Sequence, residues 1–284
     1  MPWTRSTRSE LAGALLWSVL PVAVEAASPG LPALLQATLT TTASLLLLWL
    51  WTRWRGIAVF AQDATLAPGL RLGLLFSLRI ALLYLAVVRI GAVDAVELSA
   101  GTLLLLAALA RRRARALPAA LLALAALGVL APAVEWPGAS LAVLAALAWG
   151  AQEWAAADSR LAACGGEKFI IYQLIGAAVI LPVASVVAGE NWLVRPGAVA
   201  WWALAAQLGC CVLALSLLWI APRDGLRRGP SAASLPLAAG AALALQALLD
   251  HPARWVCWGG LALLLGGAAW LQGPLRDPGA PAWE

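Results

Sequence analysis

The sequence is poor in the residues that carry metal-dependent and nucleophilic chemistry. His251 is the single histidine among 284 residues. The four cysteines form no C-x-x-C pair; they are Cys164, Cys210, Cys211 and Cys257. Sites for zinc and similar metals need clustered histidine, cysteine or carboxylate ligands at characteristic spacings. We therefore expect no metal, no other cofactor and no catalytic residues.

Signatures of nucleotide-driven and hydrolytic machinery are also missing. The chain has no phosphate-binding glycine loop, no G-x-S-x-G elbow and no H-E-x-x-H pair. These absences argue against an enzyme and against a built-in ATPase. Any active transport by this chain would have to use an ion gradient, the substrate gradient or the membrane potential.

Charged residues are scarce. They make up 12% of the chain, whereas hydrophobic residues make up 63%. A soluble domain has about twice that share of charge, and its surface must face water. A lipid bilayer removes that requirement, and the leucine and alanine excess favours helices. The composition predicts an all-α integral membrane protein with the bilayer as its main partner.

Ten apolar segments are long enough to cross a bilayer, which takes about 17–25 helical residues. In order they are Leu11–Ala27, Pro32–Trp51, Pro68–Val88, Gly91–Ala110, Leu117–Val134, Gly138–Ala157, Phe169–Ala188, Gly197–Ala221, Ser231–Leu249 and Trp255–Gln272. The connections between them are short. We therefore expect ten transmembrane helices and no separate soluble domain.

Basic residues alternate between the two sides of this topology. Of the 19 lysines and arginines, 14 fall on the side of the termini. Only Arg89, Arg195 and Arg254 fall on the other side. The positive-inside rule then places both termini in the cytoplasm of a multi-pass protein in the plasma or inner membrane. Because the basic residues are spread over separate loops, nucleic acid is not an expected partner.

The two halves of the chain resemble each other. A leucine-rich stretch precedes Trp17 in the first half and Trp149 in the second, and Leu82–Ala86 is echoed by Leu217–Ala221. These pairs keep a nearly constant offset of 132 to 135 residues. Five helices in each half would give the halves opposite orientations, as in many secondary transporters. We predict inverted repeats over residues 1–134 and 135–284.

The chain resembles the drug/metabolite transporter superfamily, in its ten-helix EamA-type branch. The resemblance covers nearly the whole chain, with loose rather than sharp motifs. It rests on Leu-Leu-Trp17-Ser, Leu-Ala-Trp149-Gly, Tyr84-Leu-Ala86, Ser231-Ala-Ala-Ser-Leu-Pro236 and Leu248-Leu-Asp250. The spacing around Trp17, Glu97 and Trp258 is similar to that of aromatic amino acid exporters. The resemblance implies two EamA repeats, cytoplasmic termini and movement, most often export, of small metabolites such as amino acids.

The chain also departs from the family pattern. The fourth segment carries Gly101-Thr102 where the family usually has a proline, and Asp250 replaces a glutamate. These departures leave the substrate, the direction of transport and the oligomeric state open.

Arg79 is the most informative residue inside an apolar segment. It lies about nine residues from either end of Pro68–Val88, or ~13 Å into the bilayer at 1.5 Å per residue. An intramembrane charge is costly and marks a site or a buried ion pair. Glu97 is its expected partner, on a helical face shared with Asp94 and Gly101. Substrate binding, together with a coupling proton on Glu97, and a purely structural ion pair both remain open.

Four further residues are candidates for substrate contact: Trp17, Trp149, Tyr84 and Glu25. The two tryptophans lie deep in pseudo-equivalent segments and would line a central cavity or pack in the core. Tyr84 would hydrogen-bond a ligand or lie at the membrane interface. Glu25 lies near the outer mouth, where a solvated carboxylate is the favoured alternative. The mid-segment amides of Gln36, Gln173, Gln207 and Gln246 are expected to bond across helices.

Three functions fit these features. A secondary transporter of small polar or amphipathic metabolites accounts for the repeats and for Arg79. An intramembrane enzyme acting on lipid or lipid-linked substrates would need clustered acids, which only Asp94 and Glu97 approach. A membrane scaffold would leave Arg79 and Glu97 as a structural pair. A cation and an anion together at the midplane would suit a zwitterion.

Overall fold

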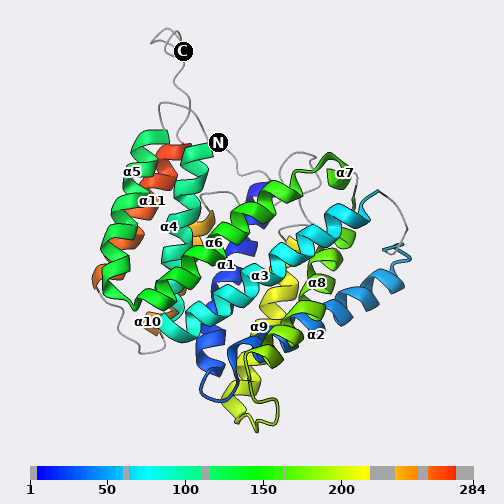
Figure 1. Cartoon of the computed structure of the whole chain (residues 1–284). Helices are drawn as coiled ribbons and strands as arrows, with labels where there is room; N and C mark the ends of the chain where they lie inside the picture. Colours follow the sequence, from blue (N-terminus) through cyan, green and yellow to red (C-terminus); the bar gives the residue numbers. More distant parts are fainter. Residues whose placement is uncertain are drawn as a thin grey trace.

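The protein is an all-helical bundle in a computed structural model (Figure 1). The structure describes residues 5–59, 64–110, 116–162, 164–217, 234–248 and 255–272. Within these ranges there is no β-strand. The helices are α1 (Arg5–Ala27), α2 (Ala33–Trp54), α3 (Leu66–Ile90), α4 (Ala92–Ala110), α5 (Ala116–Leu130), α6 (Trp136–Ala156), α7 (Ser159–Ala162), α8 (Gly166–Val187), α9 (Ala198–Leu215), α10 (Ser234–Leu248) and α11 (Trp255–Gln272).

Each of the ten predicted segments contains one long helix, so the all-helical class is confirmed. The short helix α7 was not expected. A 3₁₀ turn, Ala131–Ala133, follows α5 and contains Pro132, which cannot continue the α-helical hydrogen bonding. The expected positions Ser231 and Asp250, and the basic clusters at 111–115 and 223–228, lie outside the described residues.

Five helices, α2, α3, α4, α8 and α9, are long and apolar enough to cross a membrane. Shorter apolar helices cover Leu15–Ala27, Ala116–Leu130 and Trp255–Trp270. Large apolar side chains also face outward, including Leu70, Leu74 and Leu78 along α3. A water-soluble protein rarely exposes such continuous apolar surface. These features indicate a membrane protein.

The helices pack in pairs drawn from the two halves of the chain. The most extensive contacts join α3 to α6, α1 to α9, α3 to α8, α5 to α11, and α2 to α8. In Figure 1, α4, α5 and α11 form one side of the bundle, and α2 and α8 form the other. Helices α3 and α6 run side by side between these groups. The largest apolar core draws mainly on α1, α2, α3, α4, α6, α8 and α9.

Helices α3 and α8 meet with their backbones in contact. A Cβ atom on Gly73 would lie 2.5 Å from the carbonyl oxygen of Tyr172 and 3.1 Å from the Cα of Gly176. A Cβ on Gly176 would lie 2.4 Å from the Gly73 carbonyl carbon. One turn earlier, the ring of Tyr172 fills the space beside Gly69. Small residues four apart allow this close approach between helices in a membrane.

Because Gly73 contacts α8 so closely, adding a single methyl group at this position should have a large effect on stability. Gly73→Ala should destabilise the protein by about 1–3 kcal/mol, because the backbone of α8 cannot move away easily. Its thermal unfolding midpoint in detergent should fall clearly below that of the unmodified chain. Gly209→Ala in α9 is the matched control, since no atom lies within 4 Å of its added Cβ. Equal midpoints for the two variants would contradict the close packing of α3 on α8.

Candidate functional site

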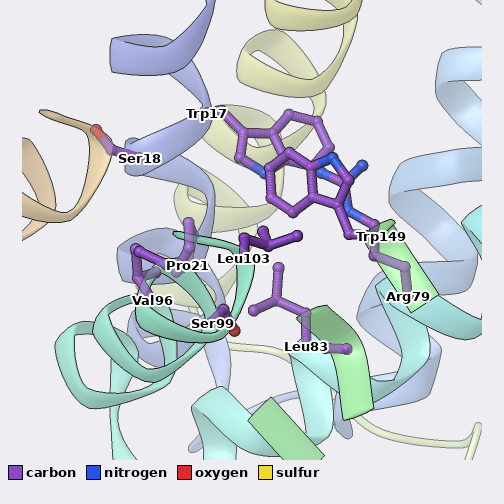
Figure 2. A pocket seen from close by; sticks show the side chains of 11 residues that line it. Trp17, Ser18, Pro21, Arg79, Leu83, Val96, Ser99, Leu103 and Trp149 are labelled. Atoms are coloured by element: carbon purple, nitrogen blue, oxygen red, sulfur yellow. The ribbon is translucent and has the colours of Figure 1, made fainter. Parts of the chain in front are cut away.

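Arg79 lies between two tryptophans where α1, α3 and α6 meet. Its guanidinium carbon is 3.4 Å from the centroid of the Trp149 ring and 4.8 Å from that of Trp17. The two indole rings contact each other edge to face, with centroids 6.4 Å apart. Only 5% of Arg79 is exposed. Figure 2 shows the two rings side by side, with Arg79 next to Trp149. The faces of the indoles provide the electrostatic attraction that a buried cation needs.

A chain of hydrogen bonds through two buried side-chain amides connects the cation to α8. The Nη1 of Arg79 donates to the Oε1 of Gln152 at 3.2 Å, and the Nε2 of Gln152 donates to the Oε1 of Gln173 at 2.9 Å. The Nε of Arg79 is buried and has no hydrogen-bond partner. A buried donor without a partner is costly, so such an atom usually has a ligand, an ion or a water. One edge of the guanidinium is therefore available to a bound group.

An acidic residue, Glu153, lies near this cation without forming an ion pair with it. The Nε1 of Trp149 donates to the Oε1 of Glu153 at 3.1 Å. This bond, one helical turn along α6, orients the ring that stacks on Arg79. Among the described residues, Arg160 and Asp158 form the only ion pair, at 2.7 Å. The groups in contact with the Arg79 guanidinium are thus aromatic faces and an amide, while the Glu153 carboxyl interacts with it electrostatically without contact.

A small cavity borders this cluster. It is lined from α1 by Trp17, Ser18 and Pro21, from α3 by Arg79 and Leu83, from α4 by Val96, Ser99, Ala100 and Leu103, and from α6 by Ala145 and Trp149. The volume open to the centres of water molecules is about 30 Å³. That is room for a few waters at most. The structure therefore represents a conformation in which this space is nearly closed.

The cavity wall is almost entirely apolar, although Arg79 is among the residues that line it. The two serines contribute little, because their hydroxyls donate to backbone carbonyls. Ser18 donates to the oxygen of Leu15 at 2.5 Å, and Ser99 to that of Ala142 at 3.1 Å. None of the described residues that line the cavity is acidic.

The structure brings together three of the six predicted site residues. Trp17, Trp149 and Arg79 line one cavity, as expected for a central site. Glu97 is fully buried in α4 but is not among the described lining residues. In the described part of the chain Arg79 makes no ion pair with Glu97, and it bonds to Gln152 instead. The expected Arg79–Glu97 pair is therefore not formed.

Tyr84 belongs to a second buried cluster centred on Gln207 of α9. The hydroxyl of Tyr84 donates to the Oε1 of Gln207 at 3.3 Å, and Thr40 donates to the same atom at 3.1 Å. The Nε2 of Gln207 donates to the Oε1 of Gln36 at 2.8 Å and to the carbonyl of Ala23. The expectation that these amides bond across helices is confirmed. Tyr84 therefore joins helices here and does not line the cavity.

Glu25 also lies away from the cavity and caps a helix. Its Oε2 accepts from the first amide of α4, Ala92 N, at 2.8 Å, and lies 3.5 Å from the Nε2 of Gln246. Glu190 plays a similar part for α2, accepting from Leu34 N at 2.9 Å and Leu35 N at 2.7 Å. Carboxylates are stabilising at helix N-termini. The half-buried Glu25 thus orients α4 against α1.

Sequence reasoning missed the role of Gln152 and Gln173 as the amides that support Arg79. Gln152 follows Trp149 by three residues, so it shares a helix face with a tryptophan already singled out. That spacing was the available signal. Nothing in the sequence could identify Val96, Leu103 and Ala145 as cavity residues, because alanine, valine and leucine occur throughout the chain.

A larger groove lies between the start of α3 and the end of α6. Its volume is about 570 Å³, and its wall includes Arg71, Trp154 and Asp158. Asp158 is paired with Arg160, which lowers the pKa of the carboxyl to about 2. The groove is open and its wall residues are largely exposed. It gathers fewer buried polar groups than the Arg79 cavity, which is therefore the better candidate site.

Comparison with known proteins supports the fold alone. No protein-family model matches the sequence, and no curated protein matches it. A solved crystal structure is similar over 98% of this chain and 99% of that chain, with a TM-score of 0.70 and 21% sequence identity. The chain therefore shares its entire architecture with a protein of nearly the same length.

The Gln152 bridge should contribute measurably to stability. Gln152→Leu removes an acceptor from Arg79 and a donor from Gln173, so it leaves buried polar groups unpaired. The expected cost is about 1–3 kcal/mol, seen as a lower thermal unfolding midpoint in detergent. Gln246→Leu is the matched control, because its amide is half-buried and makes one long bond. A larger loss for the control would show that the Arg79–Gln152–Gln173 chain is not a structural element.

Proposed function

We propose that this protein is a secondary transporter of small polar or amphipathic metabolites, with Arg79, Trp17 and Trp149 at its substrate site. The observation that carries the proposal is a buried guanidinium bordering a cavity, with one donor that has no partner. A purely structural arginine in apolar surroundings would be expected to satisfy all its buried donors. An arginine that binds substrate keeps one edge available.

The position of the cavity supports alternating access. Trp17 belongs to the first helix of the first half, and Trp149 to the first helix of the second half. Under the proposed repeat, α1 corresponds to α6 and α3 corresponds to α9. Helix α3 packs along α6, and α9 packs along α1. Two inverted halves would produce this reciprocal packing. Rocking one half against the other would separate the two indoles and open the cavity.

The membrane arrangement forms part of the same proposal. Ten helices cross the bilayer as two inverted repeats, over residues 1–134 and 135–284, with both termini in the cytoplasm. The outward-facing leucines of α3 and the aromatic residues near helix ends support contact with lipid. The resemblance to EamA-type members of the drug/metabolite transporter superfamily supports metabolite export. Buried Glu97 stands as the proposed carrier of a coupling proton.

Counterflow in proteoliposomes tests the proposal. The purified full chain is reconstituted, loaded with unlabelled metabolite and exposed to the labelled form, using a panel of amino acids and other small metabolites. We expect one substrate class to accumulate. Arg79→Ala should reduce its initial rate at least tenfold, because the group that binds substrate is lost.

Arg89→Gln is the matched control for this measurement. Arg89 lies at the exposed end of the same helix and does not line the cavity. It should keep the unmodified rate. A panel on which the unmodified chain moves nothing would exclude the transporter, and turnover of lipid substrates by the same vesicles would favour an intramembrane enzyme.

A further inference from the structure

We infer that the cavity beside Arg79 selects a carboxylate monoanion with a short apolar tail and discriminates against zwitterions and cations. The inference rests on the proposed transport function and specifies the chemistry of its substrate. It depends on three features of the cavity: the free edge of the guanidinium, the apolar wall and the two indoles that already hold a cation.

The free edge of Arg79 has the geometry of a carboxylate site. Gln152 uses the Nη1 donor, and the buried Nε has no partner. Nε and Nη2 point in parallel along the same edge of a guanidinium. Their two N–H groups match the two oxygens of a carboxylate, and such paired bonds are about twice as strong as neutral hydrogen bonds. Nη2 donates to no other described residue, so both donors of this edge are available.

The rest of the cavity favours an apolar tail. Leu83, Val96, Ala100, Leu103 and Ala145 cover the wall away from the cation. A carboxylate bound at Arg79 would place its carbon chain against these side chains. The present volume is only about 30 Å³, so binding of such a tail requires the helices around the cavity to part.

An amino group on the substrate would find no suitable partner here. The described lining residues include no carboxylate, and the hydroxyls of Ser18 and Ser99 already donate to backbone carbonyls. A charged amine buried without an acceptor carries a penalty of several kcal/mol. The cavity is therefore a poor match to free amino acids.

The aromatic faces cannot serve a cationic substrate in this arrangement. The ring of Trp149 lies 3.4 Å from the guanidinium carbon, and Trp17 covers it from 4.8 Å. A second cation would have to displace Arg79 and would then be repelled by it. An anion is the ligand favoured by direct contact, because Arg79 is the one charged residue among the described residues that line the cavity.

Binding to the full-length protein in nanodiscs, measured by isothermal titration calorimetry, tests the inference apart from transport. Four ligands share one branched carbon skeleton: 4-methylpentanoate, leucine, 4-methylpentylamine and 4-methylpentanamide. Leucine differs from the first only by its amine. We expect 4-methylpentanoate to bind at least tenfold more tightly than leucine, and the amine and the amide not to bind. Empty nanodiscs correct for partitioning of the acid into lipid.

Three variants test whether 4-methylpentanoate binds in the cavity beside Arg79. Arg79→Lys keeps the charge but cannot form the paired bonds, so affinity for 4-methylpentanoate should fall at least tenfold. Ala145→Leu fills the cavity without changing charge and should abolish binding. Arg89→Gln should bind as the unmodified chain does. Ala145→Leu keeps the test decisive if Arg79→Lys does not fold.

Three results would overturn the inference. One is tighter binding of leucine or of the amine than of the acid. The second is unchanged affinity in both Arg79→Lys and Ala145→Leu. The third is the absence of binding by any of the four ligands. If counterflow of another substrate class persists in any of these cases, the proposed transport function survives and only the assignment of substrate chemistry fails.

Discussion

The cost of burying a positive charge among apolar helices is the constraint on which the centre of this molecule depends. A buried guanidinium needs several stabilising neighbours. Among the described residues, none of the groups in contact with Arg79 is a carboxylate. Trp17 and Trp149 contribute their ring faces, and Gln152 contributes a neutral oxygen. Each of these groups comes from a helix different from that of Arg79. Stabilising one charge therefore fixes the relative positions of α1, α3 and α6.

Two buried polar clusters differ in how completely their hydrogen-bonding groups are satisfied. In the cluster of Arg79, Gln152 and Gln173, two buried donors, Arg79 Nε and Gln173 Nε2, have no partner. In the cluster around Gln207, the amide oxygen accepts from two hydroxyls and the amide nitrogen donates to α1 and α2. The second cluster is saturated and holds helices together. The first is unsaturated, which is why the proposed substrate site is placed there.

The helices could be predicted well from the sequence, because bilayer-length apolar runs broken by proline and glycine leave few alternatives. The mid-helix positions of Arg79 and of the two tryptophans followed from counting residues along those runs. The partner of Arg79 did not follow. Glu97 has a suitable depth, yet depth does not determine which neighbour a helix face meets, and α4 packs against α5, α6, α10 and α11 as well. The helix-capping role of Glu25 depends on where α4 begins in space, which no spacing along α1 encodes.

The backbone contact between Gly73 and Gly176 has a mechanical consequence for Arg79. Two helices that touch at their main chains cannot approach further, so the contact can act as a point about which one helix tilts against the other. Arg79 lies six residues further along α3, or about 9 Å at the helical rise. A tilt of about 10° at this pivot would carry the guanidinium roughly 1.6 Å sideways, computed from the same helical rise. That displacement is enough to break a stacking contact of 3.4 Å with Trp149, so a small angular change in α3 translates directly into release of the buried cation from its aromatic partner.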